Sequence, residues 1–353
     1  MSPILVYGAT GYTARLVIAA LLRAGVRPIL AARSLAPLEV LAEQLGLPYR
    51  VARLDEPGSL RAALEGVGVM LNLAGPFVNT AESVVRACFE AGAHYLDISG
   101  EVDALHALSR LHASARARGI MLMPGVGFDI VPSDCLCAYA AARVRGLRKL
   151  RVGISGLELS SPGSLKTLAH ELGRNTRVVR GGELVEIEPG SLTHDFDFGA
   201  GPRRCVAVSW GDLVTSPITT GAVEVETYFE LTWALSAIVQ ANRHFGWAYR
   251  LPWVRDAMRS SMATRAGGPT AEQMAARRAV IVVEAEGEAQ RASHRLVTPE
   301  AYTLTAETAA AIAARVLDGE CVPGFQTPSR IFGADFILSF AGVTRVEVDG
   351  IGP

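Results

Sequence analysis

The amino-acid sequence predicts an α/β protein in which a doubly wound parallel sheet is followed by a second, α+β domain with a mainly antiparallel sheet. In the first 135 residues, short apolar runs alternate with segments of helical periodicity. Such alternation is typical of parallel strands joined by right-handed helical crossovers. Beyond about residue 146 the alternation ends, and strand-like segments follow one another across turns, which favours antiparallel pairing.

Six apolar runs are the expected strands of the parallel sheet, because strands buried on both faces read as continuous apolar segments. They are Ile4–Tyr7, Pro28–Ala32, Tyr49–Leu54, Val67–Leu73, His94–Ile98 and Ile120–Met123. The helices expected between them are Thr13–Ala24, Leu35–Leu45, Gly58–Glu65, Ala81–Ala91 and Glu101–Arg118. Glycine follows several of these helices, as at Gly46 and Gly92, which is typical of helix C-termini.

At roughly 100–200 residues per domain, a chain of 353 residues predicts two domains. We expect residues 1–146 to form the first, together with a C-terminal return by residues 320–353 that includes a last helix around Ile331–Phe340. Residues 147–319 are expected to form a substrate and dimerisation domain. Its expected strands are Lys149–Gly156, Thr176–Ile187, Cys205–Val214, Glu224–Leu231, Arg278–Glu286 and Ala289–Leu296. Its expected helices are Leu165–Leu172, Leu235–Phe245 and Ala301–Leu317.

Composition limits the partners that this chain is expected to have. With 34 basic and 35 acidic residues, the formal net charge is −1, which argues against nucleic acid. A strand-like segment at the start, no charged leader before an apolar core and no long apolar run predict a cytoplasmic protein without stable membrane insertion. The five cysteines lack the spacing of a metal site, so we expect reduced thiols, including Cys135 and Cys137, and no metal.

The first expected strand runs into a glycine-rich turn and then a helix, in the pattern G-x-x-G-x-x-A. Gly8 permits the tight turn, Gly11 lets the backbone approach a pyrophosphate, and Ala14 allows the helix to lie close to the strand. The helix N-terminus offers amide groups and a positive dipole to phosphates. In this context the pattern predicts a Rossmann dinucleotide site. Its expected contacts are Gly8, Thr10, Gly11, Tyr12 and Thr13.

The ends of the next two strands indicate which dinucleotide binds. Many NAD-binding domains place an acidic residue after the second strand, whereas this chain has Arg33 and Ser34. An arginine there suits the 2′-phosphate of NADP, so we expect NADP(H); the alternative is a solvated surface arginine. After the third strand, Asp55 is expected to accept a hydrogen bond from the adenine amino group, or instead to cap a helix.

The fourth expected strand ends at the carboxyl edge of the sheet, where ligands bind in open parallel sheets. Asn72 is its last polar residue, and Gly75 and Pro76 form the turn after it. We expect this turn to pass beside the nicotinamide ribose.

Several segments resemble the saccharopine dehydrogenase-like oxidoreductases. They are Gly8-Ala9-Thr10-Gly11-Tyr12, Ala74-Gly75-Pro76-Phe77, the stretch from Ala91 to Glu101, Tyr302–Glu307 and Gly324–Pro328. Residues Pro124–Asp134 resemble the G-F-D-x-x-P-S-D signature of the trans-acting enoyl reductase branch, and lack the G-x-D-P-G segment of saccharopine reductases. The resemblance implies NADPH-dependent reduction of a conjugated enoyl (C=C) group in a lipid or polyketide intermediate. Imine (C=N) reduction of the saccharopine type and a non-catalytic NADP(H)-binding sensor are the alternatives.

Three residues are candidates for the catalytic machinery. Asp129 lies in the loop Gly125–Asp134, which is expected to border the nicotinamide and to form one wall of the substrate pocket, with Phe128 supplying apolar surface. The alternative role of Asp129 is helix capping. Tyr95 stands on the fifth strand near Asp97 and Glu101. His170, four residues after Lys166, is a possible proton donor on a helix face, with a plain surface helix as the alternative.

The substrate is expected to be a small molecule, acyl or imine. The expected loop Thr215–Thr220 and the aromatic residues Phe245, Trp247, Tyr249 and Trp253 are candidates for an apolar pocket or for core. The tryptophan-rich stretch is also suited to a homodimer contact or to a lip near a membrane.

Overall fold

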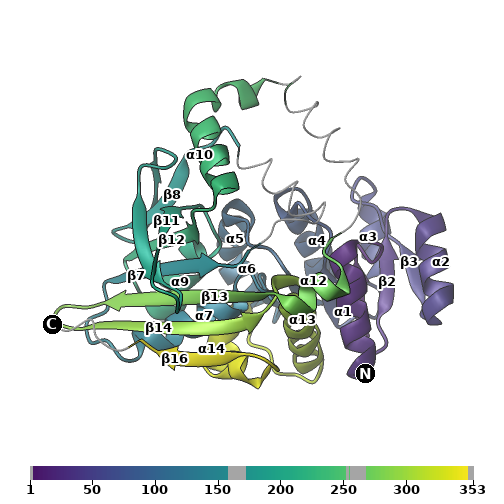
Figure 1. Ribbon diagram of the computed structural model, residues 1–353. Coiled ribbons are helices and arrows are strands. Elements are labelled where there is room, and N and C mark those ends of the chain that lie inside the picture. Colours follow the sequence, from purple (N-terminus) through teal and green to yellow (C-terminus); the bar gives the residue numbers. More distant parts are fainter. Residues whose placement is uncertain (1–2, 158–171, 252–253, 255–267, 349–353) are drawn as a thin grey trace. The chain divides into compact units, whose positions relative to one another are not determined.

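The computed structural model describes residues 3–157, 172–251, 254 and 268–348 (Figure 1). The chain forms two compact units, Met1–Val131 with Tyr302–Phe332, and Pro132–Ala301 with Gly333–Pro353. These bounds differ from the expected boundary at residue 146 and from the expected return of residues 320–353. Nearly all of the helix expected at Ala301–Leu317 belongs to the first unit, and the chain from Gly333 onward belongs to the second.

The first unit is built on a sheet of seven parallel strands in the order β15-β6-β5-β4-β1-β2-β3. The strands are β1 (Ile4–Tyr7), β2 (Ile29–Ala32), β3 (Tyr49–Val51), β4 (Val69–Asn72), β5 (His94–Asp97), β6 (Met121–Met123) and β15 (Gly324–Phe325). The order 3-2-1-4-5-6 is that of a doubly wound dinucleotide-binding sheet, so the predicted fold is confirmed. Every residue of β1, β2 and β4 is buried, as expected for strands covered on both faces.

Helices connect these strands as the alternation predicts. They are α1 (Tyr12–Arg23), α2 (Leu35–Leu45), α3 (Pro57–Ala63), α4 (Phe77–Ala91), α5 (Val102–Ser109), α6 (His112–Ala117), α13 (Ala301–Leu317) and α14 (Pro328–Phe332). The prediction of one helix over Glu101–Arg118 was wrong, because α5 ends at Ser109 and α6 begins at His112. Between them the Leu111 amide bonds to the Leu108 carbonyl, a tighter three-residue step than that of an α-helix.

The second unit contains a nine-stranded sheet. Its strands are β7 (Lys149–Ser155), β8 (Thr176–Arg180), β9 (Glu183–Ile187), β10 (Thr193–Asp197), β11 (Pro202–Ala207), β12 (Glu224–Glu230), β13 (Arg278–Glu286), β14 (Arg291–Pro299) and β16 (Thr344–Glu347). The path is β10-β11-β12-β7-β13-β14-β16, with β8 paired to β12 and β9. Among the described strands of this sheet, β12 and β7 pair in parallel and the other pairs are antiparallel, which confirms a mainly antiparallel sheet.

The helical elements of the second unit include one that the sequence patterns missed. They are α7 (Val131–Ala141), α9 (Asp212–Thr220), α10 (Trp233–Phe245), α12 (Ala271–Ala276) and the short 3-10 turns η1 (Ala248–Arg250) and η2 (Phe336–Ser339). The predicted loop Thr215–Thr220 was wrong, because these residues belong to α9. Pro217 and several threonines disfavour a helix, but α9 buries Leu213, Val214 and Thr215, and this burial outweighs local propensity.

Two further predictions in the second unit were wrong. The strand expected over Thr176–Ile187 is a hairpin, because Gly181 and Gly182 turn the chain with φ of +59° and +85° between β8 and β9. The last helix expected around Ile331–Phe340 is absent. Instead, α14 ends at Phe332 in the first unit, and η2 and β16 follow in the second.

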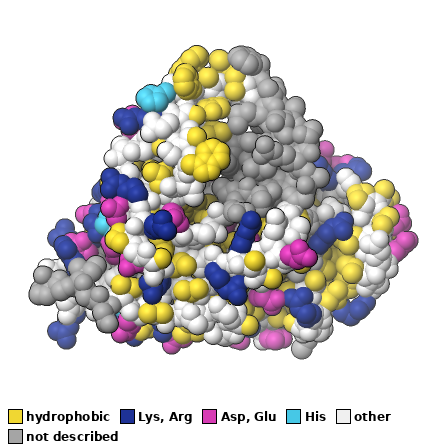
Figure 2. Space-filling view, viewed as in Figure 1, with side chains coloured by type: hydrophobic (Ala, Val, Ile, Leu, Met, Phe, Trp, Pro, Cys, Tyr) yellow, Lys and Arg dark blue, Asp and Glu magenta, His cyan; other side chains and the backbone are white. Residues whose placement is uncertain are grey.

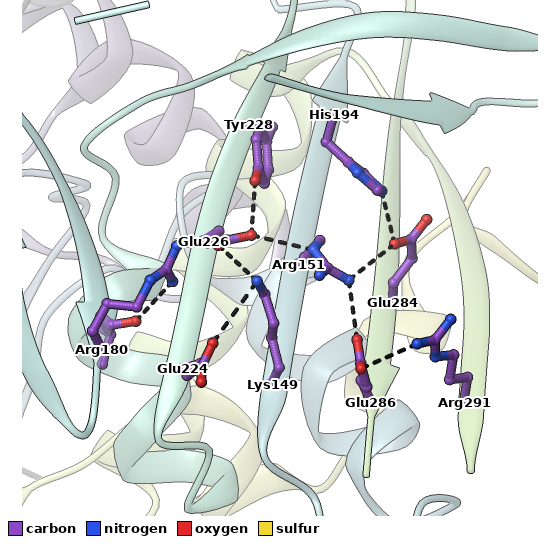
Figure 3. A network of polar contacts seen from close by, with 11 residues as sticks. Lys149, Arg151, Arg180, His194, Glu224, Glu226, Tyr228, Glu284, Glu286 and Arg291 are labelled. Carbon is purple, nitrogen blue, oxygen red and sulfur yellow. Dashed lines mark hydrogen bonds and ion pairs between the residues drawn. The ribbon is translucent and has the colours of Figure 1, made fainter. Parts of the chain in front are cut away.

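One face of the second sheet carries an ionic network (Figure 3). The Glu226 carboxylate, only 2% exposed, accepts hydrogen bonds from Lys149 at 2.8 Å and Tyr228 at 2.7 Å, and it pairs with Arg151 at 3.2 Å and with Arg180. Burial acts to raise the pKa of Glu226, but the hydrogen bonds from Lys149 and Tyr228 outweigh it and lower this pKa. Because these partners lie on β7, β8 and β12, the network ties the centre of the sheet together.

Candidate functional site

The glycine-rich turn lies at the carboxyl end of β1, against the end of β4. Gly8 has φ of +80°, and its amide donates to the Ala31 carbonyl at 2.8 Å. A Cβ atom at Gly8 would lie 2.9 Å from both the amide nitrogen and Cβ of Ala74. Both the backbone conformation and the lack of space therefore require glycine here. The turn closes through a hydrogen bond from the Gly11 amide to the Gly8 carbonyl at 3.0 Å.

The N-terminus of α1 is arranged to receive an anion. Gly11 precedes the helix in an extended conformation and is exposed, and Thr10, Tyr12 and Thr13 are half-buried. The first turn of α1 contains no acidic residue, so no carboxylate competes for the positive end of the helix dipole. Tyr12 packs edge-on against Tyr302 of α13, with 5.4 Å between ring centroids.

A group of charged residues lies after β2 and β3. Arg33 and Asp55 are both exposed. Burial is the main cause that raises the pKa of Tyr7; the charge of Arg33 acts to lower this pKa, and the charge of Asp55 acts to raise it. Ser34 is exposed and precedes α2, which its side chain does not cap. The sequence patterns missed Arg53, whose Nε donates to the Arg33 carbonyl at 3.3 Å. Parallel strands β2 and β3 end at the same edge of the sheet. The arginine that follows β3 in the sequence could therefore have predicted that Arg53 lies beside Arg33.

Asn72 organises the turn after β4. Its side chain is fully buried, and its Nδ2 donates to Thr80 and to the Tyr95 hydroxyl, each at 3.2 Å. Its Oδ1 accepts from the Ala74 amide at 3.0 Å. The amide of Asn72 is therefore engaged by the protein, and it holds the backbone that leads to Gly75. Gly75 is exposed and Pro76 is half-buried, so the turn itself is the accessible part.

Glu101, whose role the sequence patterns left open, caps α4. Its buried carboxylate accepts from the Phe77 amide at 3.0 Å and from the Val78 amide at 2.8 Å. A carboxylate at a helix N-terminus is favoured by the unpaired amides and by the helix dipole. Because Phe77 directly follows Pro76, this contact fixes the Gly75–Pro76 turn to the segment after β5.

Tyr95 lies inside the sheet and holds Asp97. The Tyr95 ring is fully buried, and its hydroxyl donates to Asp97 Oδ2 at 2.6 Å. Asp97 Oδ1 accepts from the amides of Ser99 at 2.8 Å and Gly125 at 3.0 Å. Burial raises the pKa of Asp97 to about 6, although these hydrogen bonds act in the opposite direction. With its side chain fully enclosed, Tyr95 is placed to position Asp97 and the Gly125 turn.

Asp129 lies beside this network. Gly100 leaves room for it, since a Cβ at Gly100 would be 2.9 Å from Asp129 Oδ2. The side chain of Asp129 is partly buried. Burial, followed by the nearby charges of Glu101 and Asp97, raises the pKa of Asp129 to about 7. Three carboxyl groups thus share one region at the carboxyl edge of the sheet, and the raised pKa of Asp129 is higher than that of Asp97. Carboxyl groups whose pKa is raised by burial and by neighbouring charges are common at sites of proton transfer.

The loop that carries Asp129 is anchored by α13. The Phe128 amide donates to Thr305 Oγ1 at 2.9 Å, and Gly127 leaves space for the Thr305 side chain. Phe128 is 2% exposed, so its ring offers little surface to a ligand in this structure. Thr305 was missed by the sequence patterns as a positioning residue because it follows Phe128 by 177 residues.

The other candidates fall elsewhere. His170 and Trp253 lie outside the described residues. Thr215 and Ser216 are buried in α9, whereas Phe245 and Trp247 are 60% and 65% exposed and Tyr249 is half-buried.

Within the described ranges, no group of three or more His, Cys, Asp or Glu side chains is placed to hold a metal ion. None of the helices described combines the length and hydropathy needed to cross a bilayer.

Comparison with known proteins agrees with this geometry. The family model described as the saccharopine dehydrogenase NADP binding domain matches residues 4–123, from β1 to β6. Residues 4–123 of the first unit are therefore similar to the saccharopine dehydrogenase NADP-binding domain. A bound dinucleotide fits the structure of this domain, since Gly8 and Gly11 leave the space, α1 presents an acid-free N-terminus, and Arg33 and Arg53 stand together.

The curated relatives match a stretch somewhat longer than this domain. A saccharopine dehydrogenase-like oxidoreductase of Bos taurus is 30% identical over 163 residues, covering 40% of this chain and 38% of that protein. A trans-acting enoyl reductase of Mycobacterium leprae is 33% identical over 139 residues, covering 37% of this chain and 33% of that protein. The matches thus span under two fifths of these relatives.

Similarity to a solved structure extends over nearly the whole chain. The structure of apo saccharopine dehydrogenase (L-Glu forming) from Saccharomyces cerevisiae matches with a TM-score of 0.65 and 14% identity. The match covers 99% of this chain and 100% of that protein, which shows that both units share the architecture of that structure.

Proposed function

We propose that this chain is an NADPH-dependent oxidoreductase that reduces a carbon–carbon double bond conjugated to a carbonyl group. The observation that carries the proposal is the Asp129 carboxyl, with a pKa of about 7, at the carboxyl edge of an NADP-binding sheet. The match to a trans-acting enoyl reductase supports this substrate class. NADP would be held by the Gly8–Gly11 turn, the N-terminus of α1 and the arginines Arg33 and Arg53.

When bound, NADPH supplies the hydride, which adds to the β-carbon of the conjugated double bond. The protein then has to deliver a proton to the α-carbon, which received the electron pair of the broken π bond. We assign this proton to the Asp129 carboxyl, because an acid with a pKa near neutrality is still partly protonated at pH 7. The resulting carboxylate regains its proton from water, so the net reaction consumes NADPH and one proton.

Asp97, Glu101 and Tyr95 act through Asp129 in this proposal. The negative charge of the first two keeps the pKa of Asp129 high, after burial as the main cause. Tyr95 and the Gly125 amide hold Asp97 in place. Thr305 holds the Phe128 amide one residue before Asp129. These side chains are positioning residues.

The experiment that tests this function is an assay of NADPH oxidation by the purified chain. Enoyl thioesters of several chain lengths form one panel, and amines paired with carbonyl compounds form the other. Turnover of an enoyl thioester to its saturated product supports the proposal. Turnover of the amine–carbonyl pairs alone would establish imine reduction instead. NADPH binding without oxidation in either panel would favour a sensor.

The cofactor preference gives a second test. We expect NADPH to bind more tightly than NADH, and Arg33→Asp to abolish or reverse the preference. Loss of a charge-assisted hydrogen bond is worth roughly 1.5–3 kcal/mol, or about 10- to 150-fold in affinity. Arg53→Ala is expected to weaken NADPH binding in the same direction. Titration by intrinsic fluorescence measures both dissociation constants.

The exposed Arg116 on α6 provides a control for this charge reversal. Arg116→Asp should leave the ratio of the two dissociation constants unchanged. Equal affinity of the unmutated protein for NADPH and NADH would show that Arg33 does not contact the 2′-phosphate.

The compartment and the oligomeric state remain predictions. We propose that the chain acts in the cytoplasm, on a small-molecule substrate and as a homodimer. Sedimentation velocity of the purified chain measures the last of these.

A further inference from the structure

His294 is buried on β14 in a position that favours its neutral form. The residue is only 5% exposed, and among the described residues neither of its ring nitrogens has a hydrogen-bond partner. Burying an unpaired neutral imidazole costs free energy, and burying the charged imidazolium costs much more, because no acceptor replaces the water that it loses. The position therefore accepts the neutral ring and opposes its protonation.

Tyr139 of α7 forms one wall of this position. Its ring meets the His294 ring edge-on, with 5.0 Å between the two centroids. The guanidinium carbons of Arg143 and Arg345 each lie 3.3 Å from the centroid of the Tyr139 ring. Because two guanidinium groups at this distance cannot share one face, the tyrosine ring is held between them. His294 thus packs against a ring that has a positive charge on either face.

Strand β16 reaches the same place through Arg345 and Glu347. Arg345 pairs with Asp335 at 2.7 Å, and Glu347 accepts a hydrogen bond from the Tyr139 hydroxyl at 3.2 Å and lies 3.9 Å from Arg143. Three of the four residues of β16 are exposed. Figure 2 shows acidic and basic side chains interspersed with hydrophobic ones along the lower part of the view, where Figure 1 places β16. This edge strand is therefore held by its pairing with β14 and by polar contacts more than by apolar burial.

The charges that surround His294 determine how it responds to pH. Burial is the main cause that lowers the pKa of His294, and the charges of Arg143 and Arg345 lower it further. The charge of Glu347, the cross-strand partner of His294, acts to raise this pKa, and the carboxylate of Asp335 is paired with Arg345. A histidine whose pKa is lowered by folding binds its proton more tightly in the open chain. The stability of the folded arrangement is thus complete above the ordinary histidine pKa of about 6.5, and it decreases as the pH falls below that value.

We propose that His294 makes the attachment of β16 to β14 a latch that opens in mild acid. A proton taken from water places a further positive charge beside Arg143 and Arg345. Departure of β16 relieves this arrangement, because it removes Arg345 and lets water reach the imidazolium. The proposal goes beyond the reductase activity and does not depend on it, since every residue of the latch belongs to the second unit.

The experiment is hydrogen–deuterium exchange of the full chain at pH 7.5 and pH 5.5, with the rates corrected for the intrinsic pH dependence of amide exchange. We expect the opening constant of β16 to rise by up to about tenfold between these pH values, the limit for one proton that only the open state binds. Exchange in β13, an interior strand of the same sheet, should stay slow at both pH values. No rise in β16, or an equal rise in β13, would overturn a local latch.

The variant His294→Phe tests whether the histidine is responsible. Phenylalanine keeps a ring against Tyr139 but cannot be protonated, so β16 should exchange with the same opening constant at both pH values. The matched control is His106→Phe, at an exposed histidine of α5, which should keep the acid response of the unmutated chain. An acid response that persists in His294→Phe would overturn the proposal.

A direct titration keeps the proposal testable if His294→Phe does not fold. The histidine ring signals of the unmutated chain, followed by NMR from pH 8 to pH 5, report the protonation of each imidazole. The signal of His294 is identified by its loss in a second variant, His294→Gln. We expect the pKa of His294 to lie below about 6.5. A value at or above this would show that the folded chain does not oppose the proton, and it would refute the latch.

Discussion

Asp129→Asn lowers kcat by roughly 10²- to 10⁴-fold, the contribution expected of a positioned general acid. Asparagine keeps the shape of the side chain beside Gly100 but has no proton to give at neutral pH. The dissociation constant of NADPH should change little, because the proposed cofactor contacts lie elsewhere. Steady-state kinetics with the best enoyl substrate, together with a cofactor titration, measure the two effects. The exposed Asp318 supplies the control, since Asp318→Asn should leave kcat unchanged.

The pH dependence of the unmutated enzyme follows from the same group. Since burial and the neighbouring carboxylates raise the pKa of Asp129 to about 7, its protonated form is lost as the pH rises through that value. We therefore expect kcat to fall tenfold per pH unit above about pH 7 when proton delivery limits the rate. The residual activity of Asp129→Asn should lack this descending limb. An unchanged profile in the variant would remove Asp129 from the role of proton donor.

Thermal stability separates this loss of activity from a folding defect. An unfolded aspartate ionises near pH ~3.9, whereas folded Asp129 ionises near 7, so the folded state binds its proton more tightly. The stabilising effect of this proton is complete below the unfolded pKa and is lost as the pH rises through the folded pKa. Because each unit of pKa difference corresponds to about 1.4 kcal/mol, Asp129→Asn should raise the free energy of unfolding by about 4 kcal/mol at pH 8 and by little at low pH. A lower Tm at pH 8 would contradict this electrostatic account.

Gly125→Ala is expected to cause the largest loss of stability in the first unit. Gly125 has φ of +74°, and a Cβ there would lie 2.4 Å from Ile130 Cγ1 and 3.2 Å from the Ser99 carbonyl oxygen. The left-handed backbone costs roughly 1–2 kcal/mol for alanine, and overpacking adds about 1–3 kcal/mol. We expect a total loss of about 2–5 kcal/mol in chemical denaturation, with loss of turnover because the loop of Asp129 shifts.

Gly92→Ala isolates the backbone contribution. Gly92 has the same φ of +74°, but a Cβ there would meet nothing within 4 Å. Its substitution should cost only about 1–2 kcal/mol and leave kcat intact. Equal destabilisation by the two substitutions would show that the space around Gly125 relaxes and that the contact with Ile130 does not matter.

Local patterns predicted the features that depend on neighbours in sequence. The strands β1, β2 and β4 were predicted from continuous apolar runs because both faces of a parallel sheet are covered. The glycine-rich turn was predicted because Gly8 permits a tight turn, for which it has a positive φ, and Gly11 leaves room for a phosphate to approach the backbone. These predictions failed where burial overrides propensity, as in α9, whose proline and threonines suggested a loop.

The sequence by itself determined a doubly wound sheet, a glycine-rich turn followed by a helix, and an arginine where an acid would favour NAD, because each depends on residues adjacent along the chain. Only the tertiary structure decided which polar groups share one environment. In the folded chain the buried Tyr95 donates a hydrogen bond to Asp97, and Glu101 caps α4. Thr305 accepts a hydrogen bond from the Phe128 amide, although the two residues are 177 positions apart in the sequence. The pKa of Asp129 has the same origin, since burial and the fields of two other carboxylates depend on positions in space.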